Sequence, residues 1–428
     1  MLRPHNIYYE PRSLADMVAV WSYPWQLLSR DPVETRRELS ELGVNSVTVA
    51  AHYHSIRTLD PRSEPHLFES YEGGCYFAPD RDAFAATPIN PPVNDIDGRA
   101  DPFGDVVELL REGGIDVNAW LVCFHNSKLG ADNPEFQVQS AFGDVHEHAF
   151  CPSNEAVRSY FEGVVRSLAN YDVEAINLES LGFPNAFHSH GATFGHAKNQ
   201  VVSNTAEEIL VSQCFCSACR ERAADHVVDF DHVRSVVRTL VRDVLSDPTP
   251  QVESLERLAA EYPALEDLFD FRASVIESFL ETVAVASGDV ALTYSASDGL
   301  GRDPNDGWPA GVVLDRVRPH LDRIISLCYT DDEELARRRV RRYRETTDVP
   351  VDAGVTLDPD LAGTESEWRA VVDAVSDLVD EVHIYNHALM SDAHFDWFDA
   401  VGATATGDAD EQSSHHRPLA ESDASEGG

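Results

Sequence analysis

The sequence predicts an α/β fold, a (β/α)8 TIM barrel enlarged by two insertions. Three observations support this fold. Eight short β-branched runs recur along the chain, amphipathic stretches separate them, and no glycine-rich dinucleotide fingerprint follows the first run. A doubly wound open sheet is the structural alternative, but it does not usually need eight units. The 428 residues leave room for one barrel with insertions, because barrels commonly use about 250 residues.

The predicted strands are apolar runs of the kind that form a parallel sheet buried on both faces. In chain order they cover residues 17–25, 44–55, 116–127, 173–183, 289–297, 321–329, 349–357 and 381–389. The predicted helices are amphipathic, which suits an outer layer that packs one face on the barrel. They cover residues 32–42, 103–112, 155–170, 333–346, 365–379 and 394–401.

Two insertions and a tail complete the predicted organisation. Residues 57–99 form a Pro- and Asp-rich segment after the second strand, and a long loop there usually belongs to a binding site. Residues 185–288, after the fourth strand, hold a His-rich loop, a cysteine cluster and helical patterns at 231–245 and 269–286. We therefore expect one barrel domain over residues 1–402. Residues 403–428 lack periodicity, and we expect this acidic tail to be disordered.

The charge balance is strongly acidic, with 33 basic against 74 acidic residues and a net charge of -41. Such a surface repels nucleic acid, so we expect no nucleic-acid partner. Acidic residues spread along the whole chain are typical of a halophilic protein in a salt-rich cytoplasm, where salt screens their repulsion. No signal segment or long apolar run is visible, which predicts a cytoplasmic protein without a membrane partner. The sequence is also compatible with a homo-oligomer.

Polar and aromatic side chains gather at the predicted carboxyl ends of the strands, where barrel active sites lie. The candidate substrate-binding residues are Trp21, Tyr23, His52, His54, His125, Asn126, Tyr294, Tyr329, Tyr385 and Asn386. Aromatic faces beside imidazoles and amides suit a carbohydrate, whose C–H faces pack on rings while its hydroxyls need polar partners. The expected ligand is a small carbohydrate or glycoside, and no organic cofactor is expected.

Glu179 interrupts an apolar run near the end of the fourth predicted strand. The functional interpretation is a general acid/base with a pKa raised by desolvation, and the alternative is a Glu paired with an Arg or His. Asp331, after the sixth strand, is the candidate second carboxylate. Asp332 is better explained as a helix N-cap. Asp352 and Asp358 are weaker alternatives to Asp331.

Cys214, Cys216 and Cys219 form a CxCxxC array that brings three thiolates within reach of one zinc ion. A closed structural site needs a fourth ligand, for which Cys151 and then His226 are the candidates. The alternative is three packed or exposed thiols. We predict a structural zinc.

The segment HSHGATFGH follows Glu179 and contains His188, His190 and His196. Together with His52, His54 or His125, these imidazoles are candidates for a second, catalytic metal. A loop that covers the substrate, or plain surface histidines, are the alternatives, and no ligand spacing decides among the three.

The run FCPSNEAVRSYF, the strand ending in Glu179 and the CxCxxC array resemble, in this order, the catalytic barrel of glycoside hydrolase family 42 β-galactosidases. The resemblance covers mainly residues 116–222. It implies that Cys151 joins the three later cysteines as the fourth zinc ligand, and that Glu179 is the acid/base. The chain departs from that family at Leu178, where the family has Asn, and in the seventh strand, which lacks the nucleophilic Glu.

The leading hypothesis is a glycoside hydrolase-like enzyme with Glu179 as general acid/base and Asp331 as the second carboxylate. A metal-dependent sugar isomerase, epimerase or lyase is the alternative enzyme class. A sugar-binding barrel without catalysis is the third hypothesis, and the missing Glu of the seventh strand favours it.

Overall fold

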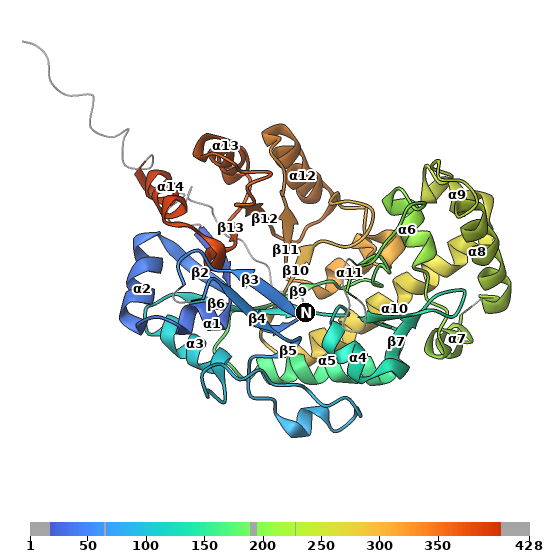
Figure 1. Cartoon of the computed structure of the whole chain (residues 1–428), viewed down its shortest axis with the longest axis horizontal. Coiled ribbons are helices and arrows are strands. Elements are labelled where there is room, and N and C mark those ends of the chain that lie inside the picture. Colours follow the sequence, from blue (N-terminus) through green and yellow to red (C-terminus); the bar gives the residue numbers. More distant parts are fainter. Residues whose placement is uncertain (1–17, 64–65, 189–194, 227, 404–428) are drawn as a thin grey trace, which may run out of the picture.

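The computed structural model describes residues 18–63, 66–188, 195–226 and 228–403. Its centre is a barrel of eight parallel strands, with helices arranged around it (Figure 1). The strands are β1 (Val18–Ser22), β2 (Val44–Tyr53), β6 (Asp116–Val122), β9 (Ala175–Glu179), β10 (Ala291–Ala296), β11 (Arg323–Leu327), β12 (Val351–Thr356) and β13 (Val382–Tyr385). Because β1 pairs in parallel with both β13 and β2, the sheet is closed. The predicted fold class is confirmed.

The strands form where runs of small and β-branched residues are buried between the barrel interior and the helices. All five residues of β1 are buried, and so are the first four of β9. The predicted strands extended beyond the observed ones, mainly at their carboxyl ends. The fourth, for example, was predicted to reach residue 183, whereas β9 ends at Glu179. Strand pairing stops there, and the residues that follow form the loops of the candidate site.

The six predicted helices are all present. They are α2 (Pro32–Glu41), α3 (Pro102–Arg111), α5 (Glu155–Leu168), α12 (Glu333–Thr346), α13 (Glu365–Ser376) and α14 (Asp392–Ala403). Side-chain caps fix their starts: Asn154 accepts hydrogen bonds from two amides of α5, and Asp332 accepts one from Leu335 N at 3.0 Å. The predicted role of Asp332 as an N-cap is confirmed. We predicted disorder for residues 403–428; Ala403 is the last residue of α14, and residues 404–428 lie outside the described residues.

The insertion after β2 is more regular than predicted. Strands β3 (Ile56–Leu59) and β4 (Phe68–Tyr71) form an antiparallel hairpin, and β5 (Gly74–Cys75) pairs antiparallel with the end of β2. The insertion after β9 contributes the helices α6 (Thr205–Val211), α7 (Ser217–Ala223), α8 (Phe230–Val244), α9 (Leu255–Glu261) and α10 (Pro263–Ser287). The long helix α10 lies against α5 and α8, which attaches this group of helices to one side of the barrel (Figure 1).

A further excursion between β6 and β9 was not predicted. It comprises α4 (Ser127–Asp132) and an antiparallel hairpin of β7 (Gln137–Gln139) and β8 (Val145–Phe150). The hairpin carries His148 toward the carboxyl end of the barrel and places Cys151 directly after β8. None of the helices in the described part of the chain combines the length and hydropathy that a membrane span requires.

Candidate active site

Glu179 is the last residue of β9, at the carboxyl end of the barrel. The indole Nε1 of Trp120, in the neighbouring strand β6, donates a 2.7 Å hydrogen bond to Glu179 Oε2. Burial raises the pKa of Glu179 to about 7, the Trp120 hydrogen bond opposes that rise, and the negative charge of Asp298 adds to it. The side chain keeps some accessible surface. Glu179 can therefore both give and accept a proton near neutral pH.

An aromatic shell surrounds the Glu179 carboxyl. Tyr23 stacks on Trp120 with ring centroids 6.1 Å apart, and the Tyr23 hydroxyl lies 3.3 Å from that of Tyr385. Tyr53 meets Trp120 edge to face at 4.6 Å. Burial raises the pKa of the tyrosine hydroxyls in this shell, so they stay protonated at neutral pH. Of the predicted substrate-binding residues, the structure brings together here Trp21, Tyr23, Tyr329 and Tyr385.

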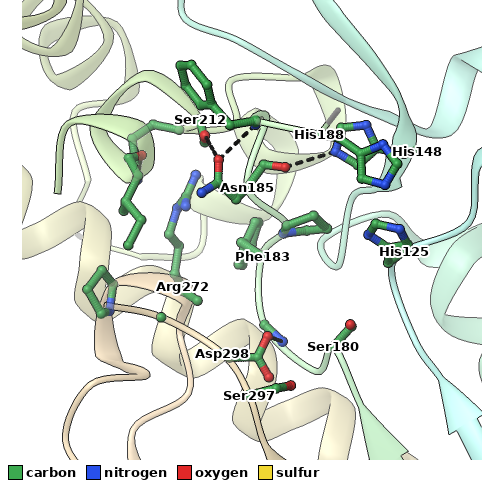
Figure 2. Close-up of a pocket in the computed structure, with 18 residues that line it drawn as sticks. His125, His148, Ser180, Phe183, Asn185, His188, Ser212, Arg272, Ser297 and Asp298 are labelled. Carbon is green, nitrogen blue, oxygen red and sulfur yellow. Dashed lines mark hydrogen bonds between the residues drawn. The ribbon is translucent and has the colours of Figure 1, made fainter. Parts of the chain in front are cut away.

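A cavity of about 280 Å³ lies among loops at the carboxyl end of the barrel (Figure 2). Its wall includes Ser180, although Glu179 itself is not among the lining residues. Three imidazoles, those of His125, His148 and His188, group on one side of the cavity. The centroids of His148 and His188 are 4.6 Å apart, and that of His125 is 4.9 Å from His188. The cavity thus combines imidazoles with apolar side chains such as Phe183 and Ile209, and its volume is at the small end of the range for ligand pockets.

Burial keeps the imidazoles of His125 and His148 neutral. Burial lowers the pKa of His148 to about 4 and that of His125 well below its usual value, and neighbouring imidazoles lower both further. His148 Nε2 lies 2.9 Å from the Asn185 carbonyl oxygen, which makes this nitrogen the donor. His54 lies next to His125, with ring centroids 5.3 Å apart, and burial lowers its pKa too. Neutral imidazoles offer both donors and acceptors to ligand hydroxyls.

Asp298, two residues beyond β10, is a buried carboxylate that the sequence analysis did not single out. It accepts hydrogen bonds from Leu181 N at 3.1 Å, Gly182 N at 3.0 Å and the Tyr294 hydroxyl at 2.9 Å. Burial raises its pKa, and these three bonds oppose the rise. Asp298 therefore fixes the loop that follows Glu179 and supplies the negative charge that raises the Glu179 pKa. The hydroxyl of Tyr294, a predicted substrate-binding residue, is thus bound to this carboxylate.

Three predicted substrate-binding residues form hydrogen bonds within the protein, although Asn386 Nδ2 has no hydrogen-bond partner. His52 is fully buried, with Nδ1 3.0 Å from the Val122 carbonyl oxygen and Nε2 3.1 Å from the Tyr160 hydroxyl. Asn126 caps α4 with its side-chain oxygen and donates to a backbone carbonyl at the end of β2. Asn386 accepts a hydrogen bond from the backbone amide two residues ahead. These contacts hold the rim of the barrel together.

Asp331, the predicted second carboxylate, is exposed in the turn before α12. It is not among the residues that line the cavity, whereas Asp298 is. The reason is local: the chain leaves β11 toward the helix that Asp332 caps, so Asp331 stays on the surface. Of the two carboxylates, Asp298 is the one that lines the cavity and acts electrostatically on Glu179.

Trp120 and His148 were not among the predicted site residues either. Trp120 lies inside a predicted strand, and nothing in the run DVNAWLV marks it as the partner of a carboxylate 59 positions later. His148 belongs to a hairpin whose short, polar strands gave no alternating apolar signal. Asp298, in contrast, could have been predicted as a site residue, because it directly follows the predicted strand 289–297.

The four predicted zinc ligands come together next to the cavity. Cys151 Sγ lies 3.4 Å from Cys219 Sγ, 3.5 Å from Cys216 Sγ and 3.7 Å from Cys214 Sγ. Zn–S bonds of about 2.3 Å in a tetrahedron separate the sulfurs by about 3.8 Å, so the cluster fits a zinc ion. The buried guanidinium of Arg272 lies within electrostatic reach of all four thiols, as suits a cluster with negative charge. The four cysteines could bind a metal such as zinc. Of the two candidates for the fourth ligand, Cys151 belongs to the cluster and His226 does not.

Within the described residues, three or more metal-ligating atoms lie within 4.8 Å of one another in two places only. One is the cysteine cluster, and the other is the group of Asp352, Glu381 and His383. The histidines of the cavity do not form such a group, and His190 lies outside the described residues. The structure thus gives no support to a catalytic metal held by the described histidines of the HSHGATFGH segment.

No protein-family model matches the chain, and no curated protein matches it in sequence. Solved structures do match in three dimensions. α-L-Fucosidase isoenzyme 2 from Paenibacillus thiaminolyticus has 13% sequence identity and a TM-score of 0.53, over 91% of this chain and 49% of the fucosidase. β-Galactosidase from the psychrophilic Marinomonas ef1 has 10% identity and a TM-score of 0.54, over 90% of this chain and 59% of the galactosidase.

The barrel resembles those of glycoside hydrolases. Identities this low show a shared fold, and they assign the chain to no particular family. The chain spans about half the length of the fucosidase, so the fucosidase carries regions with no counterpart here. The expected likeness to glycoside hydrolase barrels is supported at the level of architecture.

Proposed function

We propose that this chain is a glycoside hydrolase-like enzyme in which Glu179 protonates the glycosidic oxygen. The observation that carries the proposal is the state of that carboxyl: burial raises its pKa to about 7, and Trp120 Nε1 orients it through a 2.7 Å hydrogen bond. A carboxylic acid with a pKa near the working pH is the proton donor that glycoside hydrolysis requires. The position of Glu179 at the carboxyl end of a barrel strand agrees with this role.

Asp298 is the proposed second carboxylate, in place of Asp331. It is buried, lines the cavity and acts electrostatically on Glu179. Hydrogen bonds from Leu181, Gly182 and Tyr294 hold it in one orientation. In the proposed reaction Asp298 activates water or stabilises positive charge on the sugar while Glu179 donates its proton.

The proposed substrate is a small glycoside that binds between the aromatic shell and the cavity. Tyr329 and Tyr385, which keep some accessible surface, offer ring faces for the C–H side of a sugar. The buried rings of Tyr23 and Trp120 pack behind them. The neutral imidazoles of His125 and His148 offer hydrogen bonds to its hydroxyls. A cavity of about 280 Å³ favours one sugar unit over a long oligosaccharide.

The test is hydrolysis of a panel of aryl and alkyl glycosides of both anomers, in buffers with high salt. We expect E179Q to lose roughly 10²- to 10⁴-fold in turnover of the best substrate, with an unchanged circular dichroism spectrum. D331N is the matched control and should keep the wild-type rate, because Asp331 is exposed. Unchanged turnover in E179Q would remove Glu179 from the reaction. Tight sugar binding without turnover in the wild type would instead identify a non-catalytic sugar-binding barrel.

A further inference from the structure

A second cluster of metal-ligating side chains lies at the opposite end of the barrel from Glu179. Asp352 is the second residue of β12 and His383 the second of β13, and Glu381 directly precedes β13. All three therefore lie at the amino ends of parallel strands. Asp352 is fully buried and the His383 side chain is 3% exposed. The ring of His383 packs inside the barrel, with its centroid 5.3 Å from that of Trp21.

The spacing of the three ligand atoms fits a metal ion better than a hydrogen bond. His383 Nε2 lies 3.5 Å from Asp352 Oδ2 and 3.4 Å from Glu381 Oε2. Despite these short distances, neither ring nitrogen of His383 has a hydrogen-bond partner. Zinc bonds of about 2.0–2.2 Å to nitrogen and oxygen in a tetrahedron separate the ligand atoms by about 3.3–3.6 Å. The buried, unpartnered imidazole thus points to where two carboxylates converge.

The charge balance of this cluster favours binding of a divalent cation. Arg323 Nη1 contacts Asp352 at 2.8 and 2.9 Å and lies 3.4 Å from Asp380 Oδ2. Asp352 and Asp380 thus share one guanidinium, whose positive charge also acts on Glu381. Asp352 and Glu381 place two carboxylates beside His383 in a partly buried position, where unneutralised carboxylates are costly. One divalent ion would neutralise them.

We propose that Asp352, Glu381 and His383 bind a divalent transition metal of the zinc class through Oδ2, Oε2 and Nε2, with water completing the tetrahedron. One imidazole with two carboxylates is a donor set that suits zinc more than magnesium or calcium, which prefer oxygen alone. The ion is structural. In TIM barrels the catalytic residues lie at the carboxyl ends of the strands, whereas residues at the amino ends, where this cluster lies, contribute to stability. It joins the starts of β12 and β13. The inference is independent of the proposed function.

Metal analysis of the purified chain after dialysis against zinc provides the test. We expect two equivalents per chain in the wild type, one in H383Q and one in C214S. H226Q is the matched histidine control and should retain both equivalents, because His226 belongs to neither group of ligand atoms. One equivalent in the wild type, lost in C214S and retained in H383Q, would overturn the proposal.

Cobalt spectroscopy of the wild type gives a second readout that does not depend on the folding of a variant. The cysteine site should give intense sulfur-to-cobalt charge-transfer bands, whereas the proposed site, which has only nitrogen and oxygen donors, should add weak ligand-field bands alone. We expect both signals, with a second cobalt equivalent adding only the weak bands. Saturation of all spectral change at one equivalent would contradict the second site.

Discussion

Trp120 Nε1 donates a 2.7 Å hydrogen bond to Glu179 Oε2, across two neighbouring strands of the barrel. This bond favours the charged carboxylate, whereas burial and the charge of Asp298 favour the protonated acid. The pKa of about 7 is the balance of these opposing effects, so each can be tested by removing it.

W120F should raise the Glu179 pKa, because it removes a donor to the carboxylate. A hydrogen bond to a charged group contributes about 1.5–3 kcal/mol, and about 1.4 kcal/mol corresponds to one pH unit. We therefore expect the alkaline limb of the kcat/KM profile to move up by about one unit or more. A limb that stays in place would show that the indole does not control the acid.

D298N should move the same limb in the opposite direction. The Asp298 charge raises the Glu179 pKa, so a neutral amide allows Glu179 to ionise at lower pH. We also expect a lower maximal rate, since Asp298 is the proposed second carboxylate. The pH profile of D331N is the control and should match the wild type. An upward shift in D298N would contradict the electrostatic role of Asp298.

E179Q should stabilise the fold at alkaline pH. The folded-state pKa of about 7 exceeds the ordinary value of 4.5, so the folded chain binds this proton more tightly than the unfolded chain. The resulting contribution to the free energy of unfolding is fully present below pH 4.5. It falls by about 3 kcal/mol as the pH rises through about 7. Urea denaturation at pH 4 and pH 8 should show the wild type losing this amount relative to E179Q. Parallel pH dependences of the two proteins would refute the buried acid.

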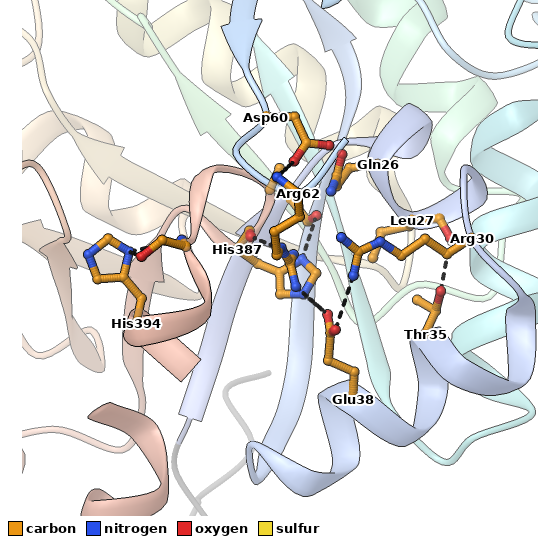
Figure 3. A network of polar contacts seen from close by, with 12 residues as sticks. Gln26, Leu27, Arg30, Thr35, Glu38, Asp60, Arg62, His387 and His394 are labelled. Atoms are coloured by element: carbon orange, nitrogen blue, oxygen red, sulfur yellow. Dashed lines mark hydrogen bonds and ion pairs between the residues drawn. The ribbon is translucent and has the colours of Figure 1, made fainter. Parts of the chain in front are cut away.

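Glu38 anchors the first insertion to the barrel (Figure 3). It accepts bonds from Arg62 Nη1 at 3.0 Å, Arg30 Nη1 at 3.1 Å and His387 Nε2 at 3.0 Å. Burial alone would raise its pKa, but the His387 hydrogen bond and the Arg62 charge lower it to about 2. Glu38 therefore contributes stability above pH 4.5 that disappears as the pH falls toward 2.

E38Q should lower the free energy of unfolding at pH 7 by roughly 2 kcal/mol, with the difference from the wild type shrinking below pH 4.5. E41Q, on the exposed side of the same helix, should change it by less than about 0.5 kcal/mol. Equal effects of the two substitutions would show that the contacts of Glu38 stabilise the fold no more than an ordinary surface ion pair does.

Local sequence signals predicted the barrel well, because each strand and helix carries its own periodicity. Helix α12 matches its predicted bounds, since Asp332 is a strong N-cap and the apolar face repeats regularly. Glu179 was predictable as a carboxyl inside an apolar run. The hairpin of β7 and β8 was not, because its strands are short and polar.

The partners of Glu179 depend on strand register, which no local pattern specifies. Trp120 reaches Glu179 because β6 and β9 pair with Val122 opposite Glu179. His52 shows the converse: it belongs to the correct strand, but its ring points to Tyr160 on α5 instead of toward the site. Proximity to a strand end was therefore a good guide to the region and a weak guide to side-chain direction.

The most direct test of the account is the leaving-group dependence of hydrolysis by E179Q. If Glu179 is the general acid, the substitution should slow alkyl glycosides by about 10²- to 10⁴-fold and dinitrophenyl glycosides far less, because an acidic leaving group departs without protonation. An equal loss for every leaving group would contradict the role of Glu179 as the proton donor.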